Sequence, residues 1–194
     1  MHHRYFLLNK PFGMLSQFSG EKDDKLLGEC FDFPKDVYSV GRLDKDSEGL
    51  LLLTNDNTLK HSILHPEMHS TKTYWVQVEG IPTIDQLKRL ELGELQIRHK
   101  GKLHSTKKTT CKPIEEPPIW ERNPPIRFRA TIPTSWIELQ LTEGKNRQVR
   151  KMTAAVGLPT LRLIRSKIGL LEIGTMKPGE VREIDYSLAK KALM

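Results

Sequence analysis

The stretch that most constrains the fold is a polar loop between two glycines, followed directly by an unbroken apolar run. The loop, Gly41–Gly49, reads GRLDKDSEG, and the run is Leu50–Leu53. An apolar run this short is typical of a strand buried on both faces. Val37–Val40, upstream, has the composition of another short strand. We therefore predict strand, sharply turned loop and buried strand, with glycine supplying the backbone conformations that the turn requires.

Two carboxylates, Asp44 and Asp46, lie within this loop. A carboxylate on a rigid loop has surroundings that the protein can control, which suits a catalytic group. The alternative is that both are turn formers, because Asp hydrogen-bonds to its own backbone.

Charge gives a first indication of the partner. The 194 residues contain 31 Lys plus Arg against 24 Asp plus Glu, a formal charge of +7 with a pI near 9.4, which favours a polyanionic partner such as nucleic acid. No apolar segment has the length of a membrane span, and the first residues lack a hydrophobic signal core. Cys30 and Cys111 have no paired spacing, so we expect free thiols in the cytoplasm.

Several segments have clear local patterns. Tyr5–Leu8 is strand-like and leads into a Pro-Gly turn that contains Lys10, by itself an ordinary solvated turn residue. Lys72–Glu79 alternates, which places Tyr74 at the end of the apolar stripe made by Val76 and Val78. There a ring is half packed and half available, although an edge-of-core tyrosine is the commoner case.

Helix signals follow. Thr83 and Gln86 have the spacing of a capping box, and the helix they begin is expected to end near Gly93, with an apolar face of Ile84, Leu87 and Leu90. The five prolines within Cys111–Pro125 predict a stiff surface connection. A strand is predicted over Trp136–Thr142, with Ile137, Leu139 and Leu141 on one face.

The second informative stretch is Glu143–Met152, EGKNRQVRKM. We predict that Asn146 caps a helix that ends at Gly157, with a buried stripe of Val149, Met152 and Val156. Cations at a helix start are disfavoured by the helix dipole, so a phosphate or a carboxylate of the protein should compensate them. The alternative is a solvated basic face.

The order of these motifs resembles that of the bacterial ribosomal RNA pseudouridine synthases, over residues 5 to about 184. The matching segments are Lys10–Gly13, Gly41–Asp44 continuing to Gly49–Leu51, Lys72–Tyr74, Glu143–Arg150 and Ile168–Gly169. Asn123–Arg127 and Ile132–Trp136 resemble the branch that acts on the large ribosomal subunit.

The resemblance implies an α+β fold, with a mixed, mostly antiparallel sheet, flanking helices and a central active-site cleft. Many relatives carry an extra N-terminal RNA-binding domain of the S4 type, and here the first motif already starts at Lys10. We therefore expect a single catalytic domain of two merged lobes over residues 1–194, acting as a cytoplasmic monomer on 23S ribosomal RNA.

The resemblance also implies roles for particular residues. Asp44 is the catalytic carboxylate, as a nucleophile or as a base; Arg150 keeps it ionised, and Tyr74 stacks on the flipped uracil. The expected substrate-binding residues are Lys10, Arg42, Leu43, Lys72, Arg147, Lys151, Arg165 and Ile168. The isomerisation needs no redox agent, so we expect no cofactor and no metal.

Two other functions fit the sequence less closely. A non-catalytic RNA-binding or ribosome-assembly protein explains the basic charge. A phosphoester hydrolase is possible if Asp44, Asp46 and Asp56 hold magnesium.

Overall fold

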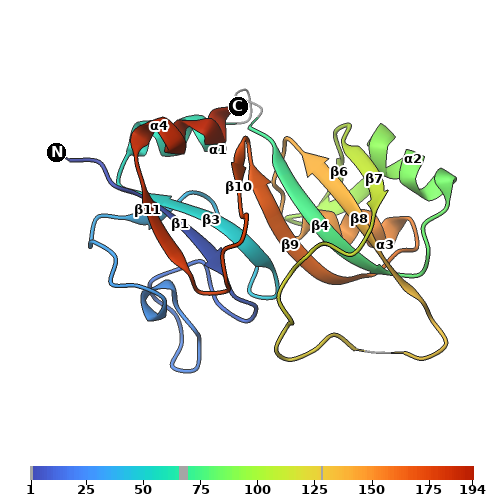
Figure 1. The fold of residues 1–194 in the computed structure, drawn as a ribbon. Coiled ribbons are helices and arrows are strands. Elements are labelled where there is room, and N and C mark those ends of the chain that lie inside the picture. The colour runs from blue at the N-terminus through green and yellow to red at the C-terminus, as the bar shows by residue number, and fades with distance from the viewer. Residues whose placement is uncertain (1, 66–69, 128) are drawn as a thin grey trace. The chain divides into compact units, whose positions relative to one another are not determined.

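The computed structural model describes residues 2–65, 70–127 and 129–194, and divides into two compact units (Figure 1). Unit 1 comprises Met1–Thr71 and Ile164–Met194, and unit 2 comprises Lys72–Leu163. Strand β9 (Thr160–Ile168) therefore begins in unit 2 and ends in unit 1.

Unit 1 is built on a sheet in which β1 (Tyr5–Lys10) lies between β11 (Val181–Ile184) and β3 (Glu48–Thr54), antiparallel to both. The short β2 (Tyr38–Ser39) also pairs with β3. On the side of β3 away from β1, the end of β9 runs parallel to it and carries β10 (Leu171–Glu172).

The predicted buried strand is confirmed. All seven residues of β3 are buried, and Leu50–Leu53 are completely so. Two of these leucines join Phe6 and Leu8 of β1 in the core of unit 1. Burying one leucine side chain stabilises the folded protein by about 1.5–3 kcal/mol. This run therefore anchors the polar loop that precedes it in the chain.

Short helices complete unit 1. They are η1 (Leu27–Glu29), α1 (Asn57–Leu64), α4 (Tyr186–Ala189) and η3 (Lys190–Leu193). Asp56 is the N-cap of α1: its side chain accepts a hydrogen bond from the Leu59 amide at 2.9 Å and so satisfies a backbone donor of the first turn.

Unit 2 contains the antiparallel strands β4 (Lys72–Glu79), β8 (Thr134–Leu141) and β7 (Thr110–Ile114), in that order. A separate hairpin is formed by β5 (Gln96–His99) and β6 (Lys102–Ser105). Helices α2 (Ile84–Leu92) and α3 (Gln148–Ala155) add side chains to the core of this unit.

Most predicted elements of unit 2 are confirmed. The capping box at Thr83 forms, α2 ends at Gly93, and the stripe of Val149, Met152 and Val156 is buried. Ile84, however, is 74% exposed, which contradicts its predicted place on the apolar face. Successive steps of three residues drift by about 60° around a helix, so Ile84 lies roughly 120° from Leu90.

Two further predictions are wrong in their details. Asn146 does not cap α3: the N-cap is Arg147, in a left-handed conformation with φ of 53° and no side-chain cap. Part of the proline-rich connection is strand β7. It tolerates Pro113 because it lies at the edge of the strand order, where a missing amide donor costs little.

The predicted α+β class, with a mixed and mostly antiparallel set of strands and flanking helices, is confirmed. Among the residues described, no helix combines the length and apolarity needed to cross a bilayer.

Candidate active site

The Asp44 loop in unit 1 is held by its own backbone and by the N-terminal turn. Asp44 is half-buried, and its carbonyl accepts a hydrogen bond from the Ser47 amide at 3.0 Å. The next carbonyl, of Lys45, accepts from the Gly13 amide at 2.8 Å. The carboxylate is therefore carried on a fixed backbone between β2 and β3.

Ser16 fixes the loop from the other side, and sequence reasoning missed it. Its hydroxyl donates to the Leu43 carbonyl at 2.9 Å and accepts from the Leu43 amide at 3.0 Å. Leu43 itself is 7% exposed, so its side chain is a core anchor for the loop. A lone serine in a turn gives no sequence signal, although it lies three residues after the Lys10–Gly13 motif.

Gly49 closes the loop at a position that only glycine fits. Its φ is 107°, and a Cβ there would lie 2.4 Å from the Arg165 carbonyl oxygen. This close approach lets β3 pair with β9 at Glu48 and Gly49. The glycine thus sets where the buried strand begins relative to Asp44.

Lys10 is completely buried below this loop. Its ammonium group donates to the carbonyls of Met14 at 2.7 Å and Pro11 at 2.9 Å. Burial lowers the pKa of Lys10 to about 8, and the nearby carboxylates, of which Glu48 has the largest effect, only partly oppose this. Lys10 therefore holds the turn next to the loop. Its contact with substrate stays a prediction, and the buried position of the side chain does not support it.

The other predicted residues of unit 1 differ in accessibility. Arg42 is exposed, with Nη1 3.4 Å from the Gln17 side-chain oxygen. Arg165 is 5% exposed and donates from Nε to the Leu50 carbonyl at 2.8 Å, while its Nη2 has no hydrogen-bond partner in the described part of the chain. Ile168, at the end of β9, is 2% exposed.

Unit 2 carries the predicted aromatic residue. Tyr74 lies on β4 opposite Leu139 of β8, partly buried against the core of the unit. The ring is thus half packed and half accessible, as the alternating pattern predicts. Lys72, at the start of the same strand, is also half-buried.

The remaining predicted cations lie at the start of α3. Arg147 is exposed and Arg150 is half-buried, with Nη1 3.4 Å from the Thr160 carbonyl. Lys151 donates from Nζ to the carbonyls of Arg98 at 2.7 Å and Asn146 at 2.8 Å. Two of these three side chains are therefore already oriented by backbone carbonyls.

A carboxylate of the protein lies beside this helix start. Burial favours the neutral form of Glu143, but hydrogen bonds from the Lys107 amide, His104 and Gln148 outweigh it and hold the pKa of Glu143 below its usual value. Since Gln148 is the first residue of α3, this supports the expectation that a negative group compensates the cations there.

The predicted residues thus fall into two groups. Unit 1 contains Asp44, Lys10, Leu43, Arg42, Arg165 and Ile168. Unit 2 carries Tyr74, Lys72, Arg147, Arg150 and Lys151.

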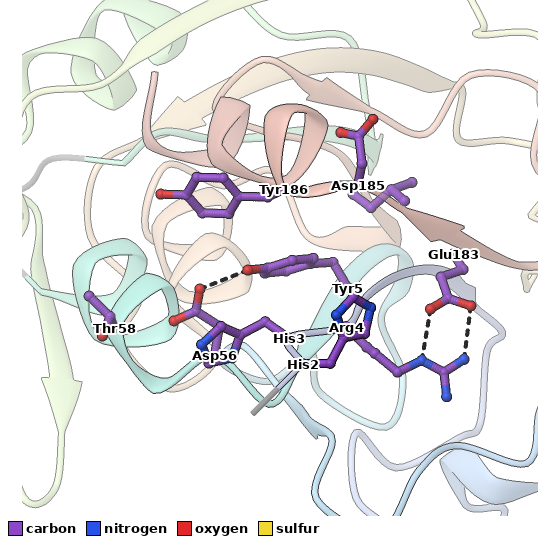
Figure 2. A pocket seen from close by; sticks show the side chains of 10 residues that line it. His2, His3, Arg4, Tyr5, Asp56, Thr58, Glu183, Asp185 and Tyr186 are labelled. Atoms are coloured by element: carbon purple, nitrogen blue, oxygen red, sulfur yellow. Dashed lines mark hydrogen bonds and ion pairs between the residues drawn. The ribbon is translucent and has the colours of Figure 1, made fainter.

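A hollow elsewhere in unit 1, of about 590 Å³, contains none of these residues (Figure 2). It is organised by the hydrogen bond from the Tyr5 hydroxyl to Asp56, at 2.9 Å, and by the ion pair of Arg4 with Glu183. Burial and that hydrogen bond raise the pKa of Tyr5 to about 12, so the phenol keeps its proton and ties β1 to the start of α1.

The alternative function, a phosphoester hydrolase, requires a cluster of side chains that can hold magnesium. Among the described residues, no group of three or more His, Cys, Asp or Glu side chains is placed to hold a metal ion. Asp56 also already serves as the cap of α1.

Comparison with known proteins decides the family. The model of the RNA pseudouridylate synthase family matches residues 4–155. The chain belongs to the RNA pseudouridylate synthase family. This match includes Asp44, Tyr74 and Arg150, and it confirms the resemblance drawn from the motifs.

Relatives within the family match almost the whole chain. Ribosomal large subunit pseudouridine synthase E of Xanthomonas campestris pv. campestris is 47% identical over 188 residues, which are 96% of this chain and 98% of that protein. The synthase E of Vibrio vulnificus is 48% identical over 93% of this chain and 75% of its own length. A crystal structure of a pseudouridylate synthase, 28% identical, superposes with a TM-score of 0.78 over 98% of this chain and 74% of that one.

Proposed function

We propose that this protein isomerises uridine to pseudouridine in the 23S RNA of the large ribosomal subunit, with Asp44 as the catalytic carboxylate. The observation that carries the proposal is the similarity, over nearly the whole chain, to proteins named large-subunit pseudouridine synthase E. The rigid attachment of the Asp44 loop supports the choice of carboxylate. The net charge of +7 suits a polyanionic substrate.

The chemistry is an intramolecular transfer. The N1–C1′ bond of uridine breaks, the uracil turns, and C5 bonds to C1′; C5 loses a proton and N1 gains one. No electrons are exchanged with another molecule. Asp44 acts at C1′ as a nucleophile or removes a proton from the sugar as a base, and both roles need the ionised carboxylate.

Arg150 and Tyr74 complete the proposed site. The Arg150 guanidinium favours the ionised form of Asp44 against the desolvation that a closed pocket imposes. The target base must leave its stack at a cost of a few kcal/mol, and stacking on Tyr74 recovers about 1–3 kcal/mol. The half-accessible position of Tyr74 on β4 supports this role.

The other predicted residues have two different roles in this proposal. Arg42, Lys72, Arg147 and Lys151, which are exposed or half-buried, meet phosphates of the RNA. Lys10, Leu43 and Ile168 shape the site from the core. Arg165 also acts from a buried position, where its side chain shapes the site beside β3.

We also propose that the protein works as a cytoplasmic monomer. The free thiols of Cys30 and Cys111 are consistent with a reducing compartment. Light scattering after size-exclusion chromatography tests the oligomeric state: a mass of one chain supports the proposal, and twice that mass contradicts it.

The experiment is modification of a 23S rRNA transcript made without modified nucleotides. With saturating wild-type protein, pseudouridine should form at a defined position. Asp44→Asn should reduce the single-turnover rate by at least about 10³-fold while RNA binding is retained. Asp23→Asn, an equal charge change at an exposed residue of the same unit, serves as the control and should keep the wild-type rate.

Each alternative gives a different result. If the wild-type protein binds the transcript but leaves every uridine unchanged, it is a binding or assembly protein. Full activity of Asp44→Asn would remove Asp44 from its role. Arg150→Ala should lower the rate by about 10²-fold with little change in the Kd for RNA; equal losses in both would make Arg150 a phosphate contact only.

A further inference from the structure

A second hollow in unit 1, of about 390 Å³, lies beside the Asp44 loop. We call it the aromatic groove and define it by Gln17, Phe18, Tyr38, Arg42, Lys60 and Leu64. These side chains come from the loop after β1, from β2 and the loop that follows it, and from α1. Its volume is in the range of small-ligand sites.

The groove is tied directly to the catalytic loop. Arg42 is separated from Asp44 by Leu43 alone, and the backbone of Leu43 is bound on both sides by Ser16, another residue that lines the groove. The Ser39 hydroxyl in turn donates to the Ser16 carbonyl at 3.2 Å. Whatever occupies the groove is therefore held in a fixed relation to Asp44.

The groove exposes two aromatic rings. Tyr38 is 55% exposed and Phe18 37% exposed, with ring centroids 6.3 Å apart and ring planes at 84°. Phe18 also rests edge-on against the core residue Phe33, at 5.6 Å. The Phe18 ring is thus held by its contact with the core, and the Tyr38 ring lies next to it. Together they offer a nucleic-acid base two aromatic surfaces in one hollow.

Positive charge accompanies the rings. The Lys60 ammonium lies 5.8 Å from the Tyr38 ring centroid, and the Arg42 guanidinium contacts Gln17 at the same hollow. None of the residues that line the groove is acidic. The hollow of Figure 2 differs in this respect, because Asp56, Glu183 and Asp185 line it and disfavour phosphate.

Exposed aromatic rings combined with cations and without carboxylates are the chemistry of a single-stranded nucleic acid site. A duplex keeps its bases stacked inside and offers the rings no face. We propose that the aromatic groove binds one unpaired nucleotide of the RNA next to the target uridine, with the base on Phe18 and Tyr38 and the phosphate on Arg42 and Lys60. This inference rests on the proposed function and supplies a means of RNA recognition within the catalytic chain.

The test measures RNA binding with the catalytically inactive Asp44→Asn protein, so that no turnover is required. The probes are a single-stranded oligouridylate of about ten nucleotides and a duplex of equal length. Tyr38→Ala should weaken binding of the single strand by roughly 5- to 140-fold, the equivalent of one base stacked on an aromatic ring, and Phe18→Ala should weaken it too. Tyr38→Phe should bind within about twofold of the parent, and binding of the duplex should not change.

Tyr186→Ala is the matched control, because Tyr186 is 54% exposed and lies in the same unit outside the groove. It should leave both Kd values unchanged. Lys60→Ala should lower the slope of log K against log salt for the single strand by about 0.7, the value for one phosphate contact. Equal Kd values for Tyr38→Ala and Tyr186→Ala, or equal losses for single strand and duplex, would overturn the proposal.

A measurement on unaltered rings covers the case in which an alanine variant unfolds. Photo-crosslinking of a 5-iodouridine oligomer to the Asp44→Asn protein should label the peptides that contain Phe18 or Tyr38; labels confined to other peptides refute the groove.

The proposed function and the proposed groove can fail independently of each other. Ring-dependent binding without any pseudouridine formed by the wild-type protein overturns the function alone, and normal modification by Tyr38→Ala with unchanged RNA affinity overturns the groove alone.

Discussion

Replacing Lys10 by methionine should change how stability depends on pH. Methionine keeps an unbranched side chain but removes the ammonium group from its buried position. In the folded protein the pKa of Lys10 is lowered from 10.5 to about 8, because burial disfavours the charged form. Between these two values the unfolded chain binds more protons than the folded one, so the free energy of unfolding rises with pH.

The magnitude follows from the two pKa values. Each pKa unit corresponds to about 1.36 kcal/mol, so the wild-type free energy of unfolding should gain about 2–3 kcal/mol from pH 7 to pH 10 relative to Lys10→Met. The variant also leaves the carbonyls of Met14 and Pro11 without the ammonium donor, but that cost does not depend on pH in this range.

The assay is urea denaturation followed by far-ultraviolet circular dichroism, for both proteins side by side across this pH range. Lys35→Met, at an exposed lysine of the same unit, is the control and should run parallel to the wild type. If the curves for the wild type and Lys10→Met stay parallel within about 0.5 kcal/mol, the lysine is not desolvated as described.

Three further substitutions test the local structure by urea denaturation. Gly49→Ala places a Cβ 2.4 Å from a backbone oxygen at a φ of 107° and should cost about 2–6 kcal/mol, whereas Gly28→Ala, with nothing within 4 Å, should cost far less; similar values for the two would contradict the close approach. Asp56→Ala removes the cap of α1 and the acceptor of the Tyr5 hydroxyl and should cost about 2–4 kcal/mol, and a loss below about 1 kcal/mol would mean that neither bond matters. Thr83→Ala, at an exposed capping box, should cost only about 1 kcal/mol, and a loss as large as that of Asp56→Ala would contradict the role of burial.

Elements with a strong local signal were predictable from the sequence. The run Leu50–Leu53 has no polar residue to place at a surface, and its short length favours a strand buried on both faces over a buried helix. Lys72–Glu79 alternates because one face packs on a core, and Thr83 with Gln86 specifies a helix start by hydrogen bonding alone. In each case the sequence signal is contained within a few consecutive residues.

The errors arose where tertiary contacts decide. Arg147 takes a left-handed conformation and is the N-cap of α3, although the residue preferences of N-caps favour its neighbour Asn146. Pro113 enters a strand because that strand is at an edge, which is a property of the strand order and not of the segment. The hairpin β5–β6 was not predicted.

The candidate site shows the same division. Motif order places Asp44 in its loop, but a basic residue in a motif looks the same whether it is exposed or buried. Arg42 is exposed while Lys10 and Arg165 are buried, and only the structure separates them. Ser16 fixes the loop through hydrogen bonds to Leu43, twenty-seven residues away in the chain, which no local pattern reveals.

The most direct test of the central claim is pseudouridine mapping in ribosomal RNA from a strain that lacks this protein. We expect one uridine of the 23S RNA to lose its modification, and a plasmid copy of the wild-type gene to restore it. The Asp44→Asn copy should be expressed at the same level and restore nothing. An unchanged pseudouridine pattern in the deleted strain, or full restoration by Asp44→Asn, would contradict the account.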